Sequence, residues 1–349
     1  YGTGGSQAND SAIRIIHYYF NRLGKTSKKK IISRVDAYHG STYLAMTLTG
    51  VKADHTGFDL APDLVSYVSC PNVYRKPDNC SEAEFCDSLV EELENEILRL
   101  GEDNVAAFIA EPIMGAGGVI VPPEGYHRRT MEVCQKYGVL YISDEVVTGF
   151  GRIGHMLSSE PVFGIKPDII TAAKGISSGY LPLSATMLSD EIYEVISQPA
   201  EDGSLFTHGF TYSGHPVCCR AALKNIEIIE REGICEHVRE VGPYFEEQLN
   251  TLRDLPIVGD VRGKCFMMCV ENVKDVSTKE LFDDEVVIGD RIAAHCQRFG
   301  LIVRPIAHLN VLSPPLILSR DDVDEVVSIL RKGIEATMDD LVREGIWNG

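Results

Sequence analysis

A lysine stands directly after a predicted buried strand. Residues 169–173 (IITAA) form a short apolar run that is typical of such a strand, and Lys174 follows them. The next five residues, GISSG, predict a tight turn. Seen alone, Lys174 would be taken for a lysine on a solvated surface, but its place after the strand suggests that its side chain is aimed inward. Such an amine can act as a nucleophile toward a carbonyl group and as a general base.

Two further features supply a carboxylate and a phosphate site. The stretch LYISDEVVTGFGR places Asp144 just past another apolar run, and ligands of open α/β sheets bind at strand ends. Alone, Asp144 would be read as a turn or capping residue. The stretch GGSQAND, residues 4–10, opens a helix with glycines, where free N–H groups and the helix dipole hold a phosphate. A lysine, a carboxylate and a phosphate-binding helix start are the parts that pyridoxal phosphate needs.

A third glycine-rich stretch looks like a nucleotide motif but lacks its context. GFGRIG, at residues 149–154, matches the G-x-G-x-x-G pattern and follows a predicted strand. The pattern requires a helix next, and Pro161, Gly164 and Pro167 interrupt the sequence there. We therefore predict no nicotinamide site.

Strands and helices alternate along the chain, which is typical of an α/β protein. The predicted strands lie at 30–35, 105–110, 139–143, 169–173 and 183–188, and the predicted helices at 6–23, 81–97 and 216–232. Residues 259–270 and 301–318 are strand-like, and a last helix spans 323–341. The expected organisation is a large domain at 1–215, a connecting helix at 216–234 and a smaller C-terminal domain at 235–349.

The composition argues against several classes of partner. Among 349 residues, 33 Lys and Arg stand against 51 Asp and Glu, and the net charge of −18 disfavours nucleic acid and anionic membranes. No run is long enough for a membrane span, and no signal peptide is visible. The ten cysteines form no metal-type C-x-x-C pairs. We predict reduced thiols, no metal site and a cytoplasmic protein.

Seven stretches follow one another in a fixed order: GGSQAND, YHGST, AEPIMGAGGVIVPPEGY, SDEVVTGFGR, AAKGISSGYLPL, HGFTYSGHPV and GLIVRP. Together they cover nearly the whole chain, which resembles the class III (ω-)aminotransferases, pyridoxal-phosphate enzymes of fold type I. The resemblance implies an α/β large domain with a mostly parallel seven-stranded sheet flanked by helices, and a smaller C-terminal α+β domain. The family also carries a segment before the phosphate-binding stretch. Because the sequence starts at Tyr1 inside that motif, we expect this N-terminal segment to be missing from it.

The resemblance assigns roles to the matching residues. Lys174 is implied to bind the cofactor covalently and to carry a proton between the substrate and the cofactor. Asp144 is implied to pair with the pyridine nitrogen, because a nearby negative charge favours the protonated ring. The other expected cofactor contacts are Gly5 and Ser6 at the phosphate, Tyr38 and Val146 on the two ring faces, and His39, Glu111, Phe210 and Thr211 around them.

The resemblance also implies a reaction, which is amino-group transfer by a ping-pong mechanism with pyridoxamine phosphate as the intermediate form of the cofactor. The 4-aminobutyrate and ornithine branches usually have glutamine after DEV, where this chain has Val147. The branch that uses an amine or ω-amino acid with pyruvate, or another 2-oxo acid, therefore fits best. Arg304 in LIVRP resembles the mobile arginine that binds the substrate carboxylate in that branch.

Thr211 resembles a residue that reaches the phosphate of a partner subunit, which implies a homodimer or tetramer with shared active sites. Two alternatives remain from the sequence. One is an aminomutase of the same fold, which keeps the amino group on one substrate. The other is an inactive homologue that binds pyridoxal phosphate.

Overall fold

The computed structural model describes residues 1–200 and 203–349 and divides into two compact units. Unit 1 comprises residues 1–117, 121–150 and 155–232. Unit 2 comprises residues 118–120, 151–154 and 233–349.

This division differs from the expected domain boundaries in two places. Helix α7 (Pro216–Arg231) belongs to unit 1 and is not a separate connector. It is fixed there because Asn225 Nδ2 donates a hydrogen bond to the carbonyl oxygen of Gly175 at 2.9 Å. Two short segments from the first half of the chain, residues 118–120 and 151–154, belong to unit 2. The first of them is fixed by Arg262, whose Nε donates a hydrogen bond to the carbonyl oxygen of Gly118 at 2.8 Å.

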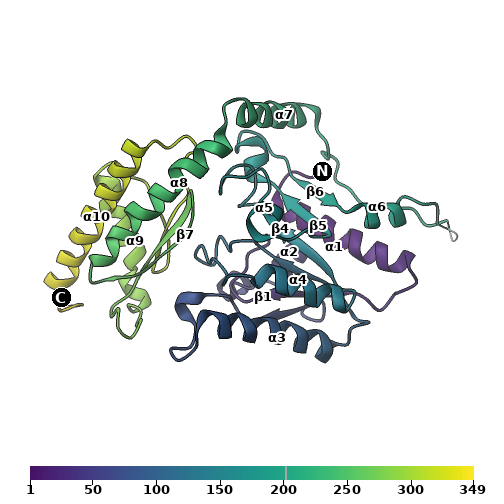
Figure 1. The fold of residues 1–349 in the computed structure, drawn as a ribbon, viewed down its shortest axis with the longest axis horizontal. Coiled ribbons are helices and arrows are strands. Elements are labelled where there is room, and N and C mark those ends of the chain that lie inside the picture. The colour runs from purple at the N-terminus through teal and green to yellow at the C-terminus, as the bar shows by residue number, and fades with distance from the viewer. Residues whose placement is uncertain (201–202) are drawn as a thin grey trace. The chain divides into compact units, whose positions relative to one another are not determined.

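Unit 1 is built on a mostly parallel sheet with the strand order β2-β1-β3-β4-β5-β6, in which only β6 runs antiparallel to its neighbour (Figure 1). The strands are β1 (Lys30–Arg34), β2 (Val65–Val68), β3 (Val105–Ala110), β4 (Leu140–Asp144), β5 (Ile169–Ala172) and β6 (Ala185–Leu188). The expected parallel character is confirmed, but this sheet has six strands over the described ranges where the resemblance implied seven. Next to β6 the chain makes only an isolated bridge between Gly2 and Ser184, which is too short for a further strand.

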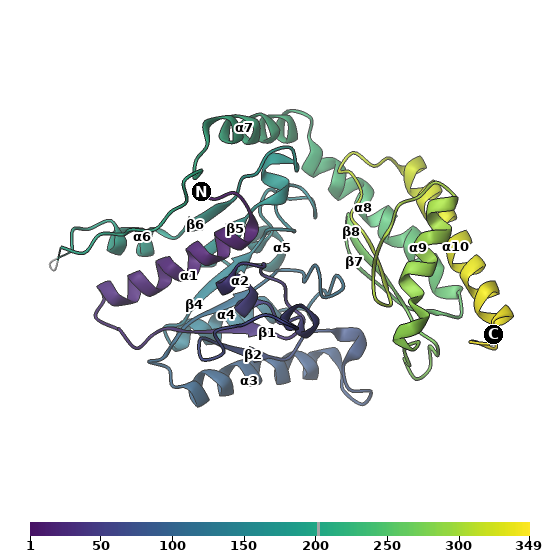
Figure 2. The same ribbon diagram turned by 180° about the vertical axis from the view of Figure 1, so that it is seen from behind.

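Helices cover both faces of this sheet. Successive residues of a strand point to opposite faces, so one strand contributes side chains to the apolar layer on each side. Ile109 of β3 belongs to the apolar cluster of α1 (Gly5–Arg22), whereas Phe108 belongs to that of α3 (Glu82–Leu100). Figures 1 and 2 show α1 along one face and α3 along the other. The strand ends that carry the candidate residues are therefore fixed between two buried layers.

The remaining helices of unit 1 connect or flank the strands. They are α2 (Tyr43–Leu48), α4 (Tyr126–Lys136), α5 (Ser159–Phe163) and α6 (Asp190–Ile196). Helix α3 begins with a capping box, since Ser81 Oγ accepts the Glu84 N–H while the Glu84 carboxylate accepts the Ser81 N–H.

Unit 2 is an α+β body around an antiparallel sheet of order β7-β8-β10-β9. Its elements are α8 (Ile234–Asn250), β7 (Val258–Lys264), β8 (Met267–Asn272), α9 (Ile288–Arg298), β9 (Arg304–Ile306), β10 (Leu309–Leu312) and α10 (Arg320–Arg343). One apolar cluster joins the three helices to the sheet, with Phe245 of α8 and Ile334 of α10 fully buried in it. The smaller α+β domain expected at the C-terminus is thus present.

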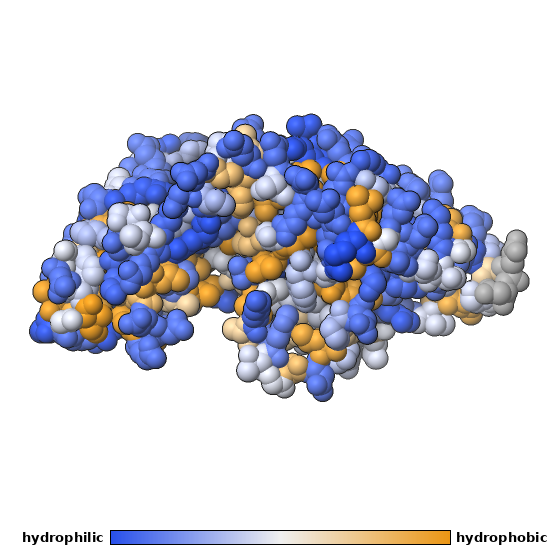
Figure 3. All heavy atoms as spheres, turned by 90° about the horizontal axis from the view of Figure 1, so that it is seen from below, coloured by the Kyte–Doolittle hydropathy of each residue, from blue (hydrophilic) through white to orange (hydrophobic). Residues whose placement is uncertain are grey.

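Polar side chains cover much of the face shown in Figure 3, in keeping with the net charge of −18. In the part of the chain that the structure describes, no helix is both long and apolar enough to cross a membrane. All ten cysteines are thiols.

Candidate active site

Asp144 is the last residue of β4, and three donors hold its buried carboxylate. Oδ2 lies 2.8 Å from Asn9 Nδ2 and 2.8 Å from His39 Nδ1. Oδ1 accepts the backbone N–H of Val146 at 3.1 Å. Because Asn9 comes from α1 and His39 from the loop after β1, these contacts join three separate segments at the end of β4.

The pKa of the Asp144 carboxyl is lowered from its ordinary value of 3.8. Burial alone raises the pKa, because it takes hydration away from the charged form. The hydrogen bond and charge of His39, with the donors of Asn9 and Val146, outweigh burial. Asp144 is therefore ionised at neutral pH and able to pair with a protonated nitrogen.

Lys174 begins the 3-10 turn η3 (Lys174–Ser177), separated by one residue from the end of β5. Strands β4 and β5 pair so that Asp144 lies opposite Thr171, three residues before Lys174. The two candidate residues thus come from the carboxyl ends of neighbouring parallel strands, where ligands of such sheets bind. Lys174 is exposed to solvent in the single chain. The expectation that its side chain is aimed inward stays a prediction.

The turn at Lys174 has a strained backbone that its surroundings hold in place. The φ angle of Lys174 is 37°, in the left-handed region, which costs a residue with a side chain on the order of 1–2 kcal/mol. Asn225 of α7 holds the carbonyl oxygen of Gly175. A Cβ at Gly175 would lie 2.9 Å from Phe150 Cβ, so only glycine fits there without a shift. Strain of this kind is concentrated at functional sites.

The start of α1 offers the open N–H groups that a phosphate needs. The N-cap residue, Gly4, supplies no side-chain cap, and the first turn contains no acidic residue. Ser6 Oγ accepts the N–H of Ser41 at 3.0 Å, which leaves the hydroxyl proton of Ser6 to donate. A Cβ at Gly5 would lie only 3.0 Å from Val146 Cγ1. The absence of a side chain at Gly5 therefore lets the helix start approach the end of β4.

These groups fit pyridoxal phosphate by the chemistry of their donors and acceptors. The ionised Asp144 suits a protonated ring nitrogen, and the uncapped start of α1 suits a phosphate. The amine of Lys174 follows the strand next to Asp144. All of these groups belong to unit 1.

Glu111 is buried and holds the loop that carries Tyr38. Its Oε1 accepts the N–H of Tyr38 at 3.0 Å, and its Oε2 accepts the N–H of Gly115 at 2.8 Å. Arg34 Nη2 donates to the backbone carbonyl of Glu111 at 2.7 Å. Burial and the charge of Asp144 raise the pKa of the Glu111 carboxyl. Glu111 therefore fixes the backbone at Tyr38, whose side chain is half-buried.

The other predicted residues have contacts of their own. Phe210 donates its N–H to Ser213 Oγ at 3.1 Å, and Thr211 is exposed in the turn that follows. Arg304 begins β9 in unit 2, where it pairs with Val311 and is exposed. The roles of Thr211 and Arg304 stay predictions.

Sequence reasoning does not single out Asn9, although it contacts Asp144. Asn9 is 1% exposed on the inward face of α1, between the buried Ala8 and Ala12. Buried polar side chains are nearly always hydrogen-bonded. A polar residue on the apolar face of the predicted helix is therefore the signal that could have identified it.

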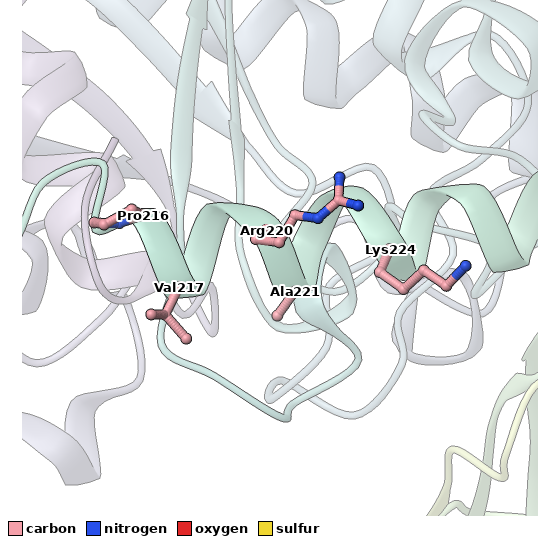
Figure 4. A pocket seen from close by; sticks show the side chains of 5 residues that line it. All are labelled: Pro216, Val217, Arg220, Ala221 and Lys224. Atoms are coloured by element: carbon pink, nitrogen blue, oxygen red, sulfur yellow. The ribbon is translucent and has the colours of Figure 1, made fainter.

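A hollow along α7 is a second feature of unit 1. Its lining side chains, Pro216, Val217, Arg220, Ala221 and Lys224, all come from this one helix (Figure 4). None of them belongs to the predicted site. Among the residues described here, no group of three or more His, Cys, Asp or Glu side chains could hold a metal ion. The cluster around Asp144 is the better candidate for an active site.

Comparisons with known proteins point to one family. Residues 1–334 match the model of the family described as Aminotransferase class-III. A probable gamma-aminobutyrate transaminase 2, mitochondrial, from Oryza sativa subsp. indica is 42% identical over 335 residues, which cover 95% of this chain and 67% of that protein. The chain thus spans about two thirds of the length of this relative.

Two solved structures confirm the predicted fold-type I architecture. A transaminase from directed evolution by ancestral reconstruction has a TM-score of 0.95 and 41% identity, covering 98% of this chain and 75% of its own. The omega transaminase from Pseudomonas jessenii in complex with PMP has a TM-score of 0.93 and 40% identity, covering 97% of this chain and 74% of its own.

Asp144→Asn should remove a loss of stability at acid pH. A carboxyl whose pKa is lowered by folding stabilises the protein above its unfolded pKa, and this stability is lost as pH falls through the folded pKa. We therefore compare the unfolding free energies of wild type and variant from about pH 5 downward. Below about pH 4 the wild type should lose stability relative to the variant.

The measurement is urea unfolding of the cofactor-free proteins across this range, with the exposed Asp63→Asn as the control. A wild type that loses no stability relative to the variant below about pH 4 would contradict the lowered pKa of Asp144.

Proposed function

We propose that this chain, which belongs to the class III aminotransferase family, transfers an amino group from an amine or ω-amino acid to pyruvate or another 2-oxo acid. Class III aminotransferases use pyridoxal 5′-phosphate. The observation that carries the proposal is the placement of Asp144 and Lys174 at the ends of neighbouring parallel strands, with the start of α1 against Val146.

Each group in the cluster has a defined task in this proposal. Asp144, with its charge maintained by His39 and Asn9, accepts the N–H of the ring nitrogen, and a nearby opposite charge favours that protonated form by about 1–3 pKa units. Bound pyridoxal phosphate supplies the electron sink for the bond that breaks at the amine-bearing carbon. Lys174 would hold the cofactor covalently and would take the proton from that carbon as general base.

The ping-pong scheme uses the same residues twice. In the first half-reaction the donor leaves its amino group at the site, and in the second the 2-oxo acid receives it. The N–H groups at the start of α1 would hold the phosphate throughout. Tyr38, with its backbone fixed by Glu111, and Val146 would contact the ring of the bound cofactor. Fixed positions of these residues matter because Lys174 must be placed for proton transfer at the substrate carbon in both halves, first of the donor and then of the acceptor.

The proposed substrate class rests on the relatives and on two residues. The rice relative is named a gamma-aminobutyrate transaminase and the Pseudomonas jessenii protein an omega transaminase. Both names are compatible with donors whose amine is remote from a carboxylate. Val147 favours the branch that accepts simple amines with pyruvate, and Arg304 supplies a charge that matches a carboxylate. The proposed cytoplasmic location rests on the ten thiols, which suit a reducing compartment.

Lys174 should carry the cofactor. Borohydride reduction of the protein loaded with pyridoxal phosphate, followed by peptide mass mapping, should place the pyridoxyl mass on Lys174. Lys166, which is ion-paired with Glu160 at the surface, is the internal control and should stay unlabelled. A label on another lysine, or none, would overturn the assignment. Alanine formed from pyruvate in the same preparation distinguishes a transaminase from an aminomutase.

Arg304→Ala should weaken the use of pyruvate more than the use of an uncharged aldehyde acceptor. A carboxylate without a partner is costly to bury, and an arginine fork binds both of its oxygens. Charged hydrogen bonds contribute about 1.5–3 kcal/mol each, so kcat/KM for pyruvate should fall roughly ten- to a hundredfold per bond. The control is Arg298→Ala, at another exposed arginine of unit 2. Equal losses for both acceptors would remove Arg304 from carboxylate recognition.

The active unit should be a homodimer or tetramer, because Thr211 resembles a phosphate ligand donated across a subunit interface. Thr211 is exposed in the single chain, and the neighbouring Tyr212 is 67% exposed, which leaves both accessible to a second copy. Sedimentation at the concentration of the assay should detect no active monomer. A fully active monomer would contradict both the interface and the role of Thr211.

A further inference from the structure

Asn9 links the start of α1 to the carboxylate of Asp144. Its Nδ2 donates to Asp144 Oδ2 at 2.8 Å and to the backbone carbonyl of His39 at 2.7 Å. Both partners can only accept, so the amide must present its nitrogen to them. Asn9 Oδ1 is buried and has no hydrogen-bond partner among the described residues. The side chain is thus used as a double donor, and the acceptor that it leaves unsatisfied is a cost.

The hydrogen bond from Asn9 determines which oxygen of Asp144 can accept a further hydrogen bond. Oδ2 receives two hydrogen bonds, from Asn9 Nδ2 and from His39 Nδ1, and a carboxylate oxygen has two lone pairs. Oδ1 receives only the N–H of Val146. Asn9 and His39 therefore fix the rotation of the carboxylate and leave Oδ1 with capacity for one more donor.

We propose that Asn9 is a positioning residue that fixes the Asp144 carboxylate relative to the phosphate-binding start of α1. The proposal rests on the function proposed above. Asn9 lies four residues after Gly5, a rise of about 6 Å along a helix. One rigid helix therefore carries both the phosphate-binding N–H groups and the donor that orients Asp144, so the two ends of a bound cofactor are held at a set separation.

Asn9→Asp is the most informative change, because it keeps the shape and replaces a donor with a second carboxyl. Two carboxylates in contact cannot both ionise without strong repulsion, so the pair should retain a proton to higher pH than either carboxyl alone. The other titratable groups that interact with Asp144 are His39 from the loop after β1 and Glu111 after β3. At low pH the protonated carboxyl at position 9 can donate to Asp144 as the amide does. At high pH it cannot.

The first measurement is unfolding of the cofactor-free protein at about pH 5.5 and pH 8. The folded Asn9→Asp variant binds more protons than its unfolded state, so its stability should fall as pH rises, relative to wild type. The matched control is Asn21→Asp, an isosteric change at an exposed position of the same helix, which should show no such dependence. Parallel behaviour of the two variants would overturn the proposal.

The second measurement is the Kd for pyridoxal phosphate added to the cofactor-free proteins. The ratio of the Kd of Asn9→Asp to that of wild type should rise about tenfold or more between the same two pH values, which corresponds to a shift of at least one pKa unit. A ratio that does not depend on pH would overturn the positioning role. A wild-type protein that binds no pyridoxal phosphate would instead defeat the proposed function, and the unfolding data would still test the contact itself.

A double variant that exchanges the residue types at positions 9 and 144 keeps the proposal testable if Asn9→Asp alone does not fold. Asn9→Asp combined with Asp144→Asn again places one amide against one carboxylate. This double variant should recover the stability that Asn9→Asp loses at pH 8, and its stability relative to wild type should no longer fall as pH rises. Failure to recover would show that Asn9 and Asp144 are not coupled.

Discussion

The buried charge of Asp144 is the constraint on which the rest of the site depends. An ionised carboxylate is costly to remove from water unless it is paired and hydrogen-bonded. Here the compensation comes from Asn9 and His39, which lie 135 and 105 residues away along the chain. Helix α1, the loop after β1 and the end of β4 therefore have to meet at one point, and the layered sheet allows this because α1 packs along its face. The same packing brings the uncapped start of α1, the proposed phosphate site, to Val146.

Glu145, the residue after Asp144, shows that burial alone does not make a carboxylate functional. It is fully buried and accepts hydrogen bonds of 2.6 to 2.9 Å from the backbone N–H and the hydroxyl of both Ser158 and Ser159. These donors come from the start of α5, so the contacts of Glu145 lock that segment to β4. Asp144 keeps an oxygen with only one donor, whereas both oxygens of Glu145 are saturated by local groups. This difference makes Asp144 the residue with capacity for a ligand, and Glu145 a structural anchor.

Features that depend on local sequence were predictable, and features that depend on distant contacts were not. The strand ends at Asp144 and Lys174 follow apolar runs, and α3 carries its capping box in four residues. Helix α8 is not predicted from the sequence, because Gly242 and Pro243 are typical of a helix break. In the structure a Cβ at position 242 would lie 2.7 Å from Cys265 Cα. The glycine therefore permits a close contact that stabilises the helix. Strand β2 was missed because it is defined by its parallel pairing with β1. The partners of Asn9 and of Glu111 were beyond sequence reasoning for the same reason, since they are remote in the chain, although the position of Asn9 on an apolar helix face was a local signal.

The two glycine-rich stretches show why a motif needs its structural context. Gly151 and Gly154 have φ angles of 97° and 83°, which residues with side chains rarely adopt, and a Cβ at Gly149 would lie 2.9 Å from the carbonyl oxygen of Glu145. These glycines allow a tight turn in the segment where the chain leaves unit 1 and returns to it. The only helix that follows shortly after, α5, has five residues and so offers little dipole. Gly4 and Gly5 instead open an 18-residue helix whose first N–H groups are uncapped. Glycine at a helix start indicates a phosphate site because it exposes N–H groups that a long helix has polarised, and only the first stretch meets that condition.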